Sequence, residues 1–202
     1  ADEPYSLPAV AFKPYPCARQ LHAGVEALLR LIQQHSIASP AIEALELSVP
    51  TAVASLVDRP SASTNRAAML GSGQYVMAVT AMRGRMDLAS FAQEFIDNNQ
   101  VKSLMIKVKV KDEIELDRYF PQSWPGRVRI VLADGRSLTD EVIIPKGESD
   151  NPMSVPELEE KFLSLAAPLL GAAGANAVIG EVGALPESES LTCLLAALQL
   201  RG

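Results

Sequence analysis

The chain has 202 residues, enough for one sizeable domain or for one domain with an appendage. Hydrophobic residues make up 48% of it and charged residues 21%, a balance that indicates a globular protein and excludes a disordered one. The formal net charge of −6 argues against nucleic acid as a main partner, because phosphate binding requires a basic surface. A small anionic substrate stays compatible with this charge, since a local field can oppose the net charge.

The two cysteines, Cys17 and Cys193, are far apart in the sequence and share no metal-ligand spacing. They argue against a disulfide framework, and we expect a cytoplasmic protein without a metal site. No run of 18 or more apolar residues occurs, so we expect no membrane-spanning segment. The acidic start carries neither a signal-peptide pattern nor a methionine, so we expect a processed chain or a piece of a longer protein.

The predicted elements begin with an extended segment over residues 1–18, which contains four prolines. A helix is predicted over 19–36, because apolar residues recur there at helical spacing. A strand is predicted over 42–49, where Leu45, Leu47 and Val49 alternate with Glu46 and Ser48. We expect residues 51–66 to be irregular and a helix to run over 74–82, after an interruption by two glycines.

The middle of the chain contains the clearest strand pattern, over residues 105–111. Ile106, Val108 and Val110 are predicted to point one way, and three lysines (Lys107, Lys109, Lys111) the other. The lysines indicate either a binding stripe or, more commonly, a solvated sheet face or protected edge strand. Before this strand, Asp87 is predicted to cap a short helix that carries Leu88, Phe91 and Phe95.

A hairpin is predicted where 128–133 and 137–144 flank Asp134-Gly135, with a type I′ turn. Together these elements predict an α+β fold, with a small antiparallel or mixed sheet packed against helices. The resulting domain covers residues 1–150.

The composition changes near residue 150, and 151–202 is predicted to be a separate helical segment rich in alanine and leucine. Ser154 and Glu157 form a capping box, and further helical patterns cover 172–185 and 189–200. Three such helices make a thin core and would fit better on a helical body that this chain lacks. We therefore expect an exposed apolar surface on 157–200, which could drive self-association.

The candidate site is the stretch from Lys13 to His22. Two prolines hold it extended and deliver Lys13 and Tyr15 just ahead of a helix, whose first turn contains Arg19 and His22. Helix N-termini attract anions, so the cations here could form a pocket for a carboxylate. The alternative interpretation is a proline linker that leads into an ordinary core helix.

The same stretch is also the first of an ordered set of motifs. The set covers nearly the whole chain: Lys13-Pro14-Tyr15-Pro16-Cys17-Ala18-Arg19 with His22, Asp58-Arg59-Pro60, Ser72-x-x-Tyr75-Val76, Met82-Arg83-Gly84, Asp134-Gly135-Arg136, and Asn151-Pro152-Met153-Ser154 followed by Glu157-Leu158 and Lys161-Phe162. In this order the motifs resemble those of the MmgE/PrpD family of 2-methylcitrate dehydratases and cis-aconitate decarboxylases. Each motif is weak alone, and the order of the set is what makes it specific.

The resemblance implies the C-terminal part of a cofactor-independent, dehydratase-like lyase (a hydro-lyase) that acts on a small polycarboxylate such as 2-methylcitrate. An N-terminal helical half would complete the cleft, so we expect the isolated chain to be inactive, and a homo-oligomer, such as a dimer, for the whole protein. The alternatives are an epimerase or isomerase of the same family, and a binding or regulatory module that keeps the fold without catalysis.

The resemblance also assigns the candidate residues. Lys13 and Arg19 would bind substrate carboxylates, and Ser72 and Tyr75 would line the cleft. His22 is either catalytic or a structural residue of the helix. Some decarboxylases of the family carry a functional histidine at the position of Ala18, so alanine there argues against decarboxylation. Cys17 is interpreted as a packing residue and not as a nucleophile.

Overall fold

The structure is a computed structural model that describes residues 10–60 and 65–199. Its contacts divide the chain into two units, one ending at Pro152 and the other beginning at Met153. The first part of the predicted 1–18 segment, part of the predicted irregular region and the end of the predicted 189–200 helix lie outside the described residues.

The first unit contains a four-stranded mixed sheet in the order β2-β1-β3-β4. Its strands are β1 (Ile42–Val49), β2 (Val108–Asp112), β3 (Gly126–Leu132) and β4 (Ser137–Val142). β1 is central: it pairs in parallel with β2 and antiparallel with β3, which in turn pairs antiparallel with β4. The predicted α+β fold is confirmed, and the sheet is mixed.

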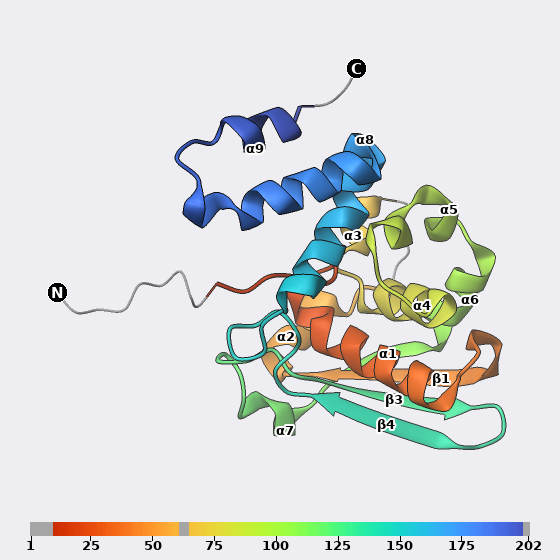
Figure 1. The fold of residues 1–202 in the computed structure, drawn as a ribbon. Coiled ribbons are helices and arrows are strands. Elements are labelled where there is room, and N and C mark those ends of the chain that lie inside the picture. The colour runs from red at the N-terminus through yellow and green to blue at the C-terminus, as the bar shows by residue number, and fades with distance from the viewer. Residues whose placement is uncertain (1–9, 61–64, 200–202) are drawn as a thin grey trace. The chain divides into compact units, whose positions relative to one another are not determined.

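Helices α1 (His22–His35) and α4 (Gly73–Arg83) lie on one face of this sheet (Figure 1). α6 (Asn99–Lys107) packs on α4 and leads into β2. The connections contain short helices: a 3₁₀ turn over Arg19–Leu21 ahead of α1, another over Ser39–Ala41, α2 (Thr51–Val57), α3 (Arg66–Met69), a 3₁₀ turn over Leu88–Phe91, α5 (Gln93–Ile96) and α7 (Ile114–Asp117). Asp87 is the predicted N-cap, and it forms a capping box with Ser90. The single short helix predicted after it is divided, because Leu88 and Phe91 lie in the 3₁₀ turn and Phe95 lies in α5.

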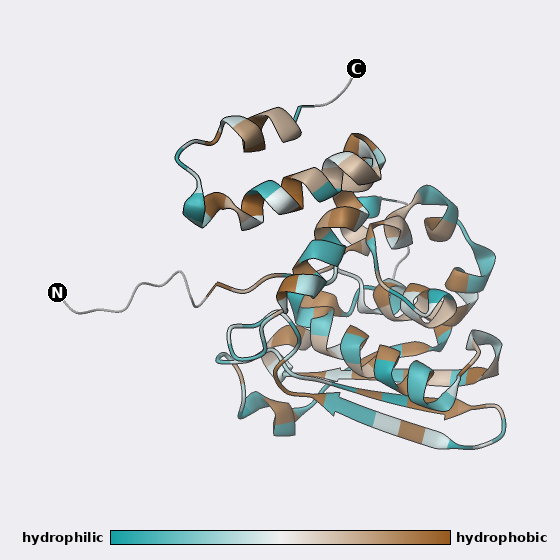
Figure 2. Cartoon of the chain, viewed as in Figure 1, coloured by the Kyte–Doolittle hydropathy of each residue, from teal (hydrophilic) through white to brown (hydrophobic). Residues whose placement is uncertain are grey.

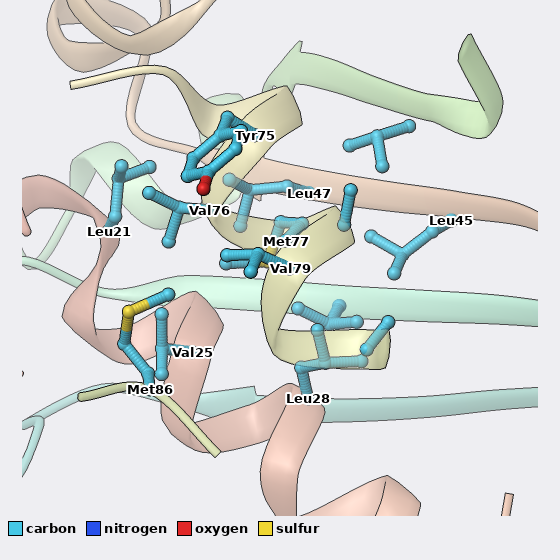
Figure 3. Packing of buried hydrophobic residues seen from close by; sticks show 14 of the residues in the cluster. Leu21, Val25, Leu28, Leu45, Leu47, Tyr75, Val76, Met77, Val79 and Met86 are labelled. Carbon is cyan, nitrogen blue, oxygen red and sulfur yellow. The ribbon is translucent and has the colours of Figure 1, made fainter. Parts of the chain in front are cut away.

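The core of the first unit lies where α1 and α4 meet the sheet, and Figure 3 shows its side chains. Leu47 of β1 is fully buried at this meeting point. A Cβ atom added to Gly24 of α1 would lie 2.4 Å from Leu47 Cδ1, and one added to Gly73 of α4 would lie 2.8 Å from Val110. Both helices therefore approach the sheet more closely than a side chain at these two positions would allow.

The prediction that residues 51–66 are irregular is wrong, because α2 covers Thr51–Val57 and α3 begins at Arg66. Val53 and Val57 are both buried and stand four residues apart, on one face of α2. This spacing indicates a helix in the sequence. The prediction gave more weight to the surrounding serines and to Pro60, which are typical of irregular segments.

The strand predicted over 105–111 begins only at Val108, because α6 continues through Lys107. The prediction that Ile106 and Val108 point to the same side is wrong, because Ile106 is 85% exposed whereas Val108 is buried. β2 is an edge strand of the sheet, and Lys111 pairs with Glu46 of β1 at 2.8 Å. These observations favour the edge-strand interpretation of the lysines over a binding stripe.

The predicted hairpin is present, but its turn is not type I′. Gly135 has φ of +85°, whereas Asp134 does not have a positive φ. The N–H of Gly135 donates to the Leu132 carbonyl and the N–H of Leu132 donates to the Arg136 carbonyl. The loop thus has three residues, a type I turn followed by a left-handed glycine, which is the next most common hairpin geometry.

The second unit is helical, with α8 (Val155–Gly183), a 3₁₀ turn over Leu185–Glu187 and α9 (Thr192–Ala197). The predicted capping box is confirmed: Ser154 accepts from the N–H of Glu157, and the Glu157 carboxylate accepts from the N–H of Ser154. Gly171, with φ of +71° and ψ of +161°, breaks α8 into two helices, in agreement with the separate helix predicted from residue 172.

Apolar side chains are exposed along this second unit, as predicted. Figure 2, coloured by residue hydropathy, shows that hydrophobic positions recur along the ribbons of α8 and α9. The exposed side chains include Leu165, Leu169, Val182, Leu191, Leu195 and Leu198. Among the described residues, α8 is the one helix long and apolar enough to cross a membrane by length and composition. Its break at Gly171 leaves neither half with the roughly 20 residues that a span requires.

Candidate functional site

A pocket of about 540 Å³ lies in the first unit, beside the predicted site. It is bordered by two cations, Lys13 and Arg59, from segments that are far apart in the sequence. The remaining lining is mostly small or apolar: Pro16, Cys17, Ala18, Gln20, Leu56, Val57, Ala67, Leu70 and Gly71. Two positive charges in a largely apolar depression favour an anionic small molecule.

The backbone of the Lys13 segment is fixed at both ends by hydrogen bonds. The N–H of Phe12 donates to the Gly147 carbonyl at 2.8 Å, and the N–H of Ala18 donates to the Leu70 carbonyl at 2.8 Å. Between them, Lys13 Nζ donates to the Cys17 carbonyl at 3.3 Å, which folds the lysine over its own loop. Lys13 therefore occupies the pocket as part of a positioned loop and not of a loose linker.

His22, which the sequence left as either catalytic or structural, is buried and only 2% exposed. Its Nε2 lies 3.4 Å from the Cys17 carbonyl oxygen, and its ring packs edge-on against Tyr15 at 5.5 Å between centroids. Burial lowers the pKa of His22 to about 4, despite the opposing hydrogen bond to the Cys17 carbonyl. The ring is therefore neutral near pH 7, and its Nε2 must carry the proton to donate to Cys17.

This lowered pKa predicts that acid destabilises the first unit. The folded state has a pKa of about 4 and the unfolded chain about 6.5, so the unfolded chain binds more protons between these values. His22 therefore makes its full contribution to the free energy of unfolding above about pH 6.5. The free energy of unfolding falls by about 2 kcal/mol between pH 7 and pH 4.5. Urea denaturation followed by the fluorescence of Trp124, the single tryptophan of the chain, measures this loss.

The variant His22→Gln is expected to lose less stability than the wild type over the same pH interval, because it has no imidazole to protonate. His35→Gln is the matched control, since His35 is exposed at the end of α1. Equal acid sensitivity of His22→Gln and the wild type would show that His22 is not a buried neutral group.

Arg19 is not gathered into the pocket with Lys13. Its guanidinium forms a bidentate ion pair with Glu148 and lies 6.0 Å from the centroid of the Trp124 ring. Glu148 belongs to the loop whose Gly147 carbonyl holds Phe12, so the pair ties that loop to the start of α1. The structure gives Arg19 an anchoring role, and its part in substrate binding stays a prediction.

Ser72 and Tyr75 both serve the framework of the unit. Ser72 is the N-cap of α4: its oxygen accepts from the N–H of Tyr75 at 3.2 Å and its hydroxyl donates to the Arg59 carbonyl at 2.8 Å. Tyr75 is fully buried against Phe91, and its hydroxyl donates to the Ser90 carbonyl at 2.6 Å. Burial raises the pKa of Tyr75 to about 12. Their predicted contact with substrate stays a prediction.

The Tyr75 hydroxyl is expected to contribute to stability. Tyr75→Phe removes the donor and leaves the carbonyl of Ser90, a buried residue, without this bond, which costs about 1–3 kcal/mol. Tyr119→Phe is the control, because the Tyr119 hydroxyl accepts from the exposed Arg118. Urea denaturation of both variants checks the prediction, and equal stability of the two would contradict it.

Cys17 is 3% exposed, and burial raises the pKa of its thiol to about 12. Its thiolate is therefore absent near neutral pH, which supports the interpretation of Cys17 as a packing residue. Within the described ranges, no group of three or more His, Cys, Asp or Glu residues is arranged to hold a metal ion.

Arg59 and Gln20 are pocket residues that the sequence did not single out for the site. Arg59 was visible as part of the Asp58-Arg59-Pro60 motif, which indicated a family loop without indicating what it faces. Its position depends on contacts with α4, and no local pattern in the sequence reports them.

Comparison with known protein families shows which family this chain belongs to. The profile of the MmgE/PrpD C-terminal domain matches residues 15–184. The chain belongs to the MmgE/PrpD family. It is 27% identical to the cis-aconitate decarboxylase of Homo sapiens, over 94% of this chain and 40% of that protein, and 27% identical to that of Mus musculus, over 94% and 39%. This MmgE/PrpD chain thus spans about 40% of the length of the curated relatives that it matches.

Proposed function

We propose that this chain is the C-terminal part of a cofactor-independent lyase that acts on a small polycarboxylate, and that Lys13 binds one substrate carboxylate. The observation that carries the proposal is the position of Lys13, which a hydrogen-bonded loop holds at a pocket of small-molecule size. Membership of the MmgE/PrpD family supports it, as does the name of the two relatives, cis-aconitate decarboxylase.

The chemistry that this pocket suits is the formation of negative charge beside a carboxylate. In a dehydration, a base removes the proton next to the carboxylate and the hydroxyl leaves as water. In a decarboxylation, the carbon–carbon bond breaks, carbon dioxide leaves and the carbon is then protonated. Both steps gain from a fixed cation at the carboxylate, and Lys13 supplies it.

His22 contributes as a positioning residue in this proposal. It is buried and neutral, and its Nε2 contacts the same Cys17 carbonyl that accepts from Lys13. A group with this burial does not reach a substrate in the pocket. The acid and base that move the protons then come from the N-terminal helical half of the parent protein.

Dehydration, as of 2-methylcitrate, is the reaction that we favour over decarboxylation. Ala18 lines the pocket beside Lys13, at the position where the family resemblance places a functional histidine in some decarboxylases. A methyl group there cannot donate or accept a proton. The names of the two relatives favour decarboxylation instead, so the assay must separate the two products.

The second candidate function is a binding module without catalysis. Ala18, together with the glycines on either side of Ser72, supports it, because these positions hold no side chain that could take part in proton transfer. Such a module would bind polycarboxylates in the same pocket and leave them unchanged.

The test is an assay of the full-length parent protein with 2-methylcitrate, citrate and cis-aconitate, followed by proton NMR of the reaction mixture. A dehydratase produces an alkene from the hydroxy acids, a decarboxylase releases carbon dioxide from cis-aconitate, and a binding module changes none of them. Absence of any turnover, together with absence of binding, would overturn the proposal.

A further inference from the structure

We propose that Arg59 is a second carboxylate-binding residue of the pocket, which selects substrates with at least two carboxylates, and that Ser72 and Gln74 hold it in place. The proposal rests on the function proposed above. In this proposal the positive charge of Arg59 binds a second carboxylate. The buried polar residues Ser72 and Gln74, at the start of α4, contribute to specificity by holding Arg59 in place.

The backbone of Arg59 is fixed on both sides by side chains of α4 and its N-cap. The N–H of Arg59 donates to Gln74 Oε1 at 3.0 Å, and its carbonyl accepts from Ser72 Oγ at 2.8 Å. Gln74 Nε2 also donates to Asp58 Oδ1 at 2.6 Å. Ser72 and Gln74 are both only 3% exposed, so these bonds form where water does not compete well. The loop that carries Arg59 is thereby positioned before any ligand arrives.

The guanidinium of Arg59 lies over the backbone of Gly71, another residue of the pocket lining. Its Nη1 and Cζ atoms are 3.5 and 3.8 Å from the position that a Cβ of Gly71 would take. Within residues 10–60 and 65–199, this guanidinium has no ion pair with a carboxylate. Arg19, Arg83 and Arg127, by contrast, are each neutralised by an acidic neighbour. Arg59 keeps its charge available to a ligand.

The chemistry of the two cations defines the ligand. An arginine offers a planar pair of N–H donors that matches a carboxylate, whereas a lysine acts as a compact point charge. Lys13 and Arg59 reach the same pocket from two loops that are each held by hydrogen bonds. A ligand with two carboxylates engages both cations at once, and a monocarboxylate engages one.

The test measures binding to the full-length protein by isothermal titration calorimetry, with tricarballylate as a polycarboxylate that cannot be dehydrated and butyrate as a monocarboxylate. Arg59→Gln is expected to raise the Kd for tricarballylate about 10–50-fold, and that for butyrate less than about threefold, because only the former loses a partner. Arg59→Lys is expected to recover only part of the affinity, since lysine keeps the positive charge but lacks the planar pair of N–H donors.

Gln74→Ala tests the positioning role. This variant leaves all charges in place but removes the side chain that holds the Arg59 loop. The loop must then become ordered when the ligand binds, so we expect the Kd for tricarballylate to rise about fivefold or more. Arg136→Gln, at the exposed hairpin tip, is the charge-matched control and is expected to bind as the wild type does.

The outcomes separate the two proposals. If the wild type binds tricarballylate and Arg59→Gln binds it equally well, the assignment of Arg59 is overturned while the proposed function stands. If the wild type neither binds tricarballylate nor turns over any polycarboxylate, both are overturned. Equal losses of tricarballylate and butyrate affinity in Arg59→Gln would also overturn the assignment, because they would indicate a general disturbance of the pocket.

Discussion

Replacement of Lys13 by methionine in the full-length protein is expected to lower kcat/KM on the proposed polycarboxylate substrate by about 10³-fold. Methionine keeps much of the length and the apolar stem of lysine but removes the ammonium, which the proposed reaction uses to hold a carboxylate and to offset the negative charge that forms beside it. The factor corresponds to about 4 kcal/mol of transition-state stabilisation, a common magnitude for a charged group at such a position.

Lys109→Met is the matched control for this experiment, because Lys109 is exposed on edge strand β2 and does not line the pocket. It is expected to leave steady-state kinetics unchanged. Lys13→Arg is expected to recover part of the activity through its charge. A Lys13→Met enzyme with wild-type kcat/KM would show that the pocket is not the carboxylate site.

The second large effect is expected in the core, where Leu47→Ala should lower the free energy of unfolding by about 2–5 kcal/mol. Leu47 is fully buried on the central strand β1, and its two methyl groups lie against the backbone of α1 at Gly24 and of α4 at Gly73. Its truncation leaves a cavity between the sheet and both helices, and urea denaturation followed by Trp124 fluorescence measures the loss.

The same contact predicts how Gly24 and Leu47 depend on each other. Gly24→Ala alone should destabilise the unit, because the added Cβ would lie 2.4 Å from Leu47 Cδ1 and force it to move. In the Leu47→Ala background this clash is absent, and Gly24→Ala should be neutral or stabilise by up to about 1 kcal/mol through its higher helix propensity. Additive effects of the two substitutions would contradict the packing described here.

The sequence predicted elements well where a local pattern determines them. Strand β1 was predicted with its observed bounds because Leu45, Leu47 and Val49 alternate with polar residues. The Ser154 capping box and the Asp134-Gly135 hairpin position followed from turn and cap chemistry. Where two patterns overlap, as at the end of α6 and the start of β2, the alternation of the lysines extended the predicted strand into the helix.

The site was predictable only in part. Lys13 was found because prolines and a helix start surround it, and these are local features. The neutralisation of Arg19 by Glu148, 129 residues away, depends on tertiary contacts that no local pattern contains. Tyr75 and His22 carry polar atoms that are typical of a cleft, yet their contacts with the carbonyls of Ser90 and Cys17 place them in the framework.

The central claim is that the pocket at Lys13 binds a polycarboxylate, and a crystal structure of the full-length protein with tricarballylate tests it most directly. We expect one carboxylate within hydrogen-bond distance of Lys13 Nζ and a second within reach of the Arg59 guanidinium. Tricarballylate bound elsewhere, in contact with neither Lys13 nor Arg59, would contradict the claim.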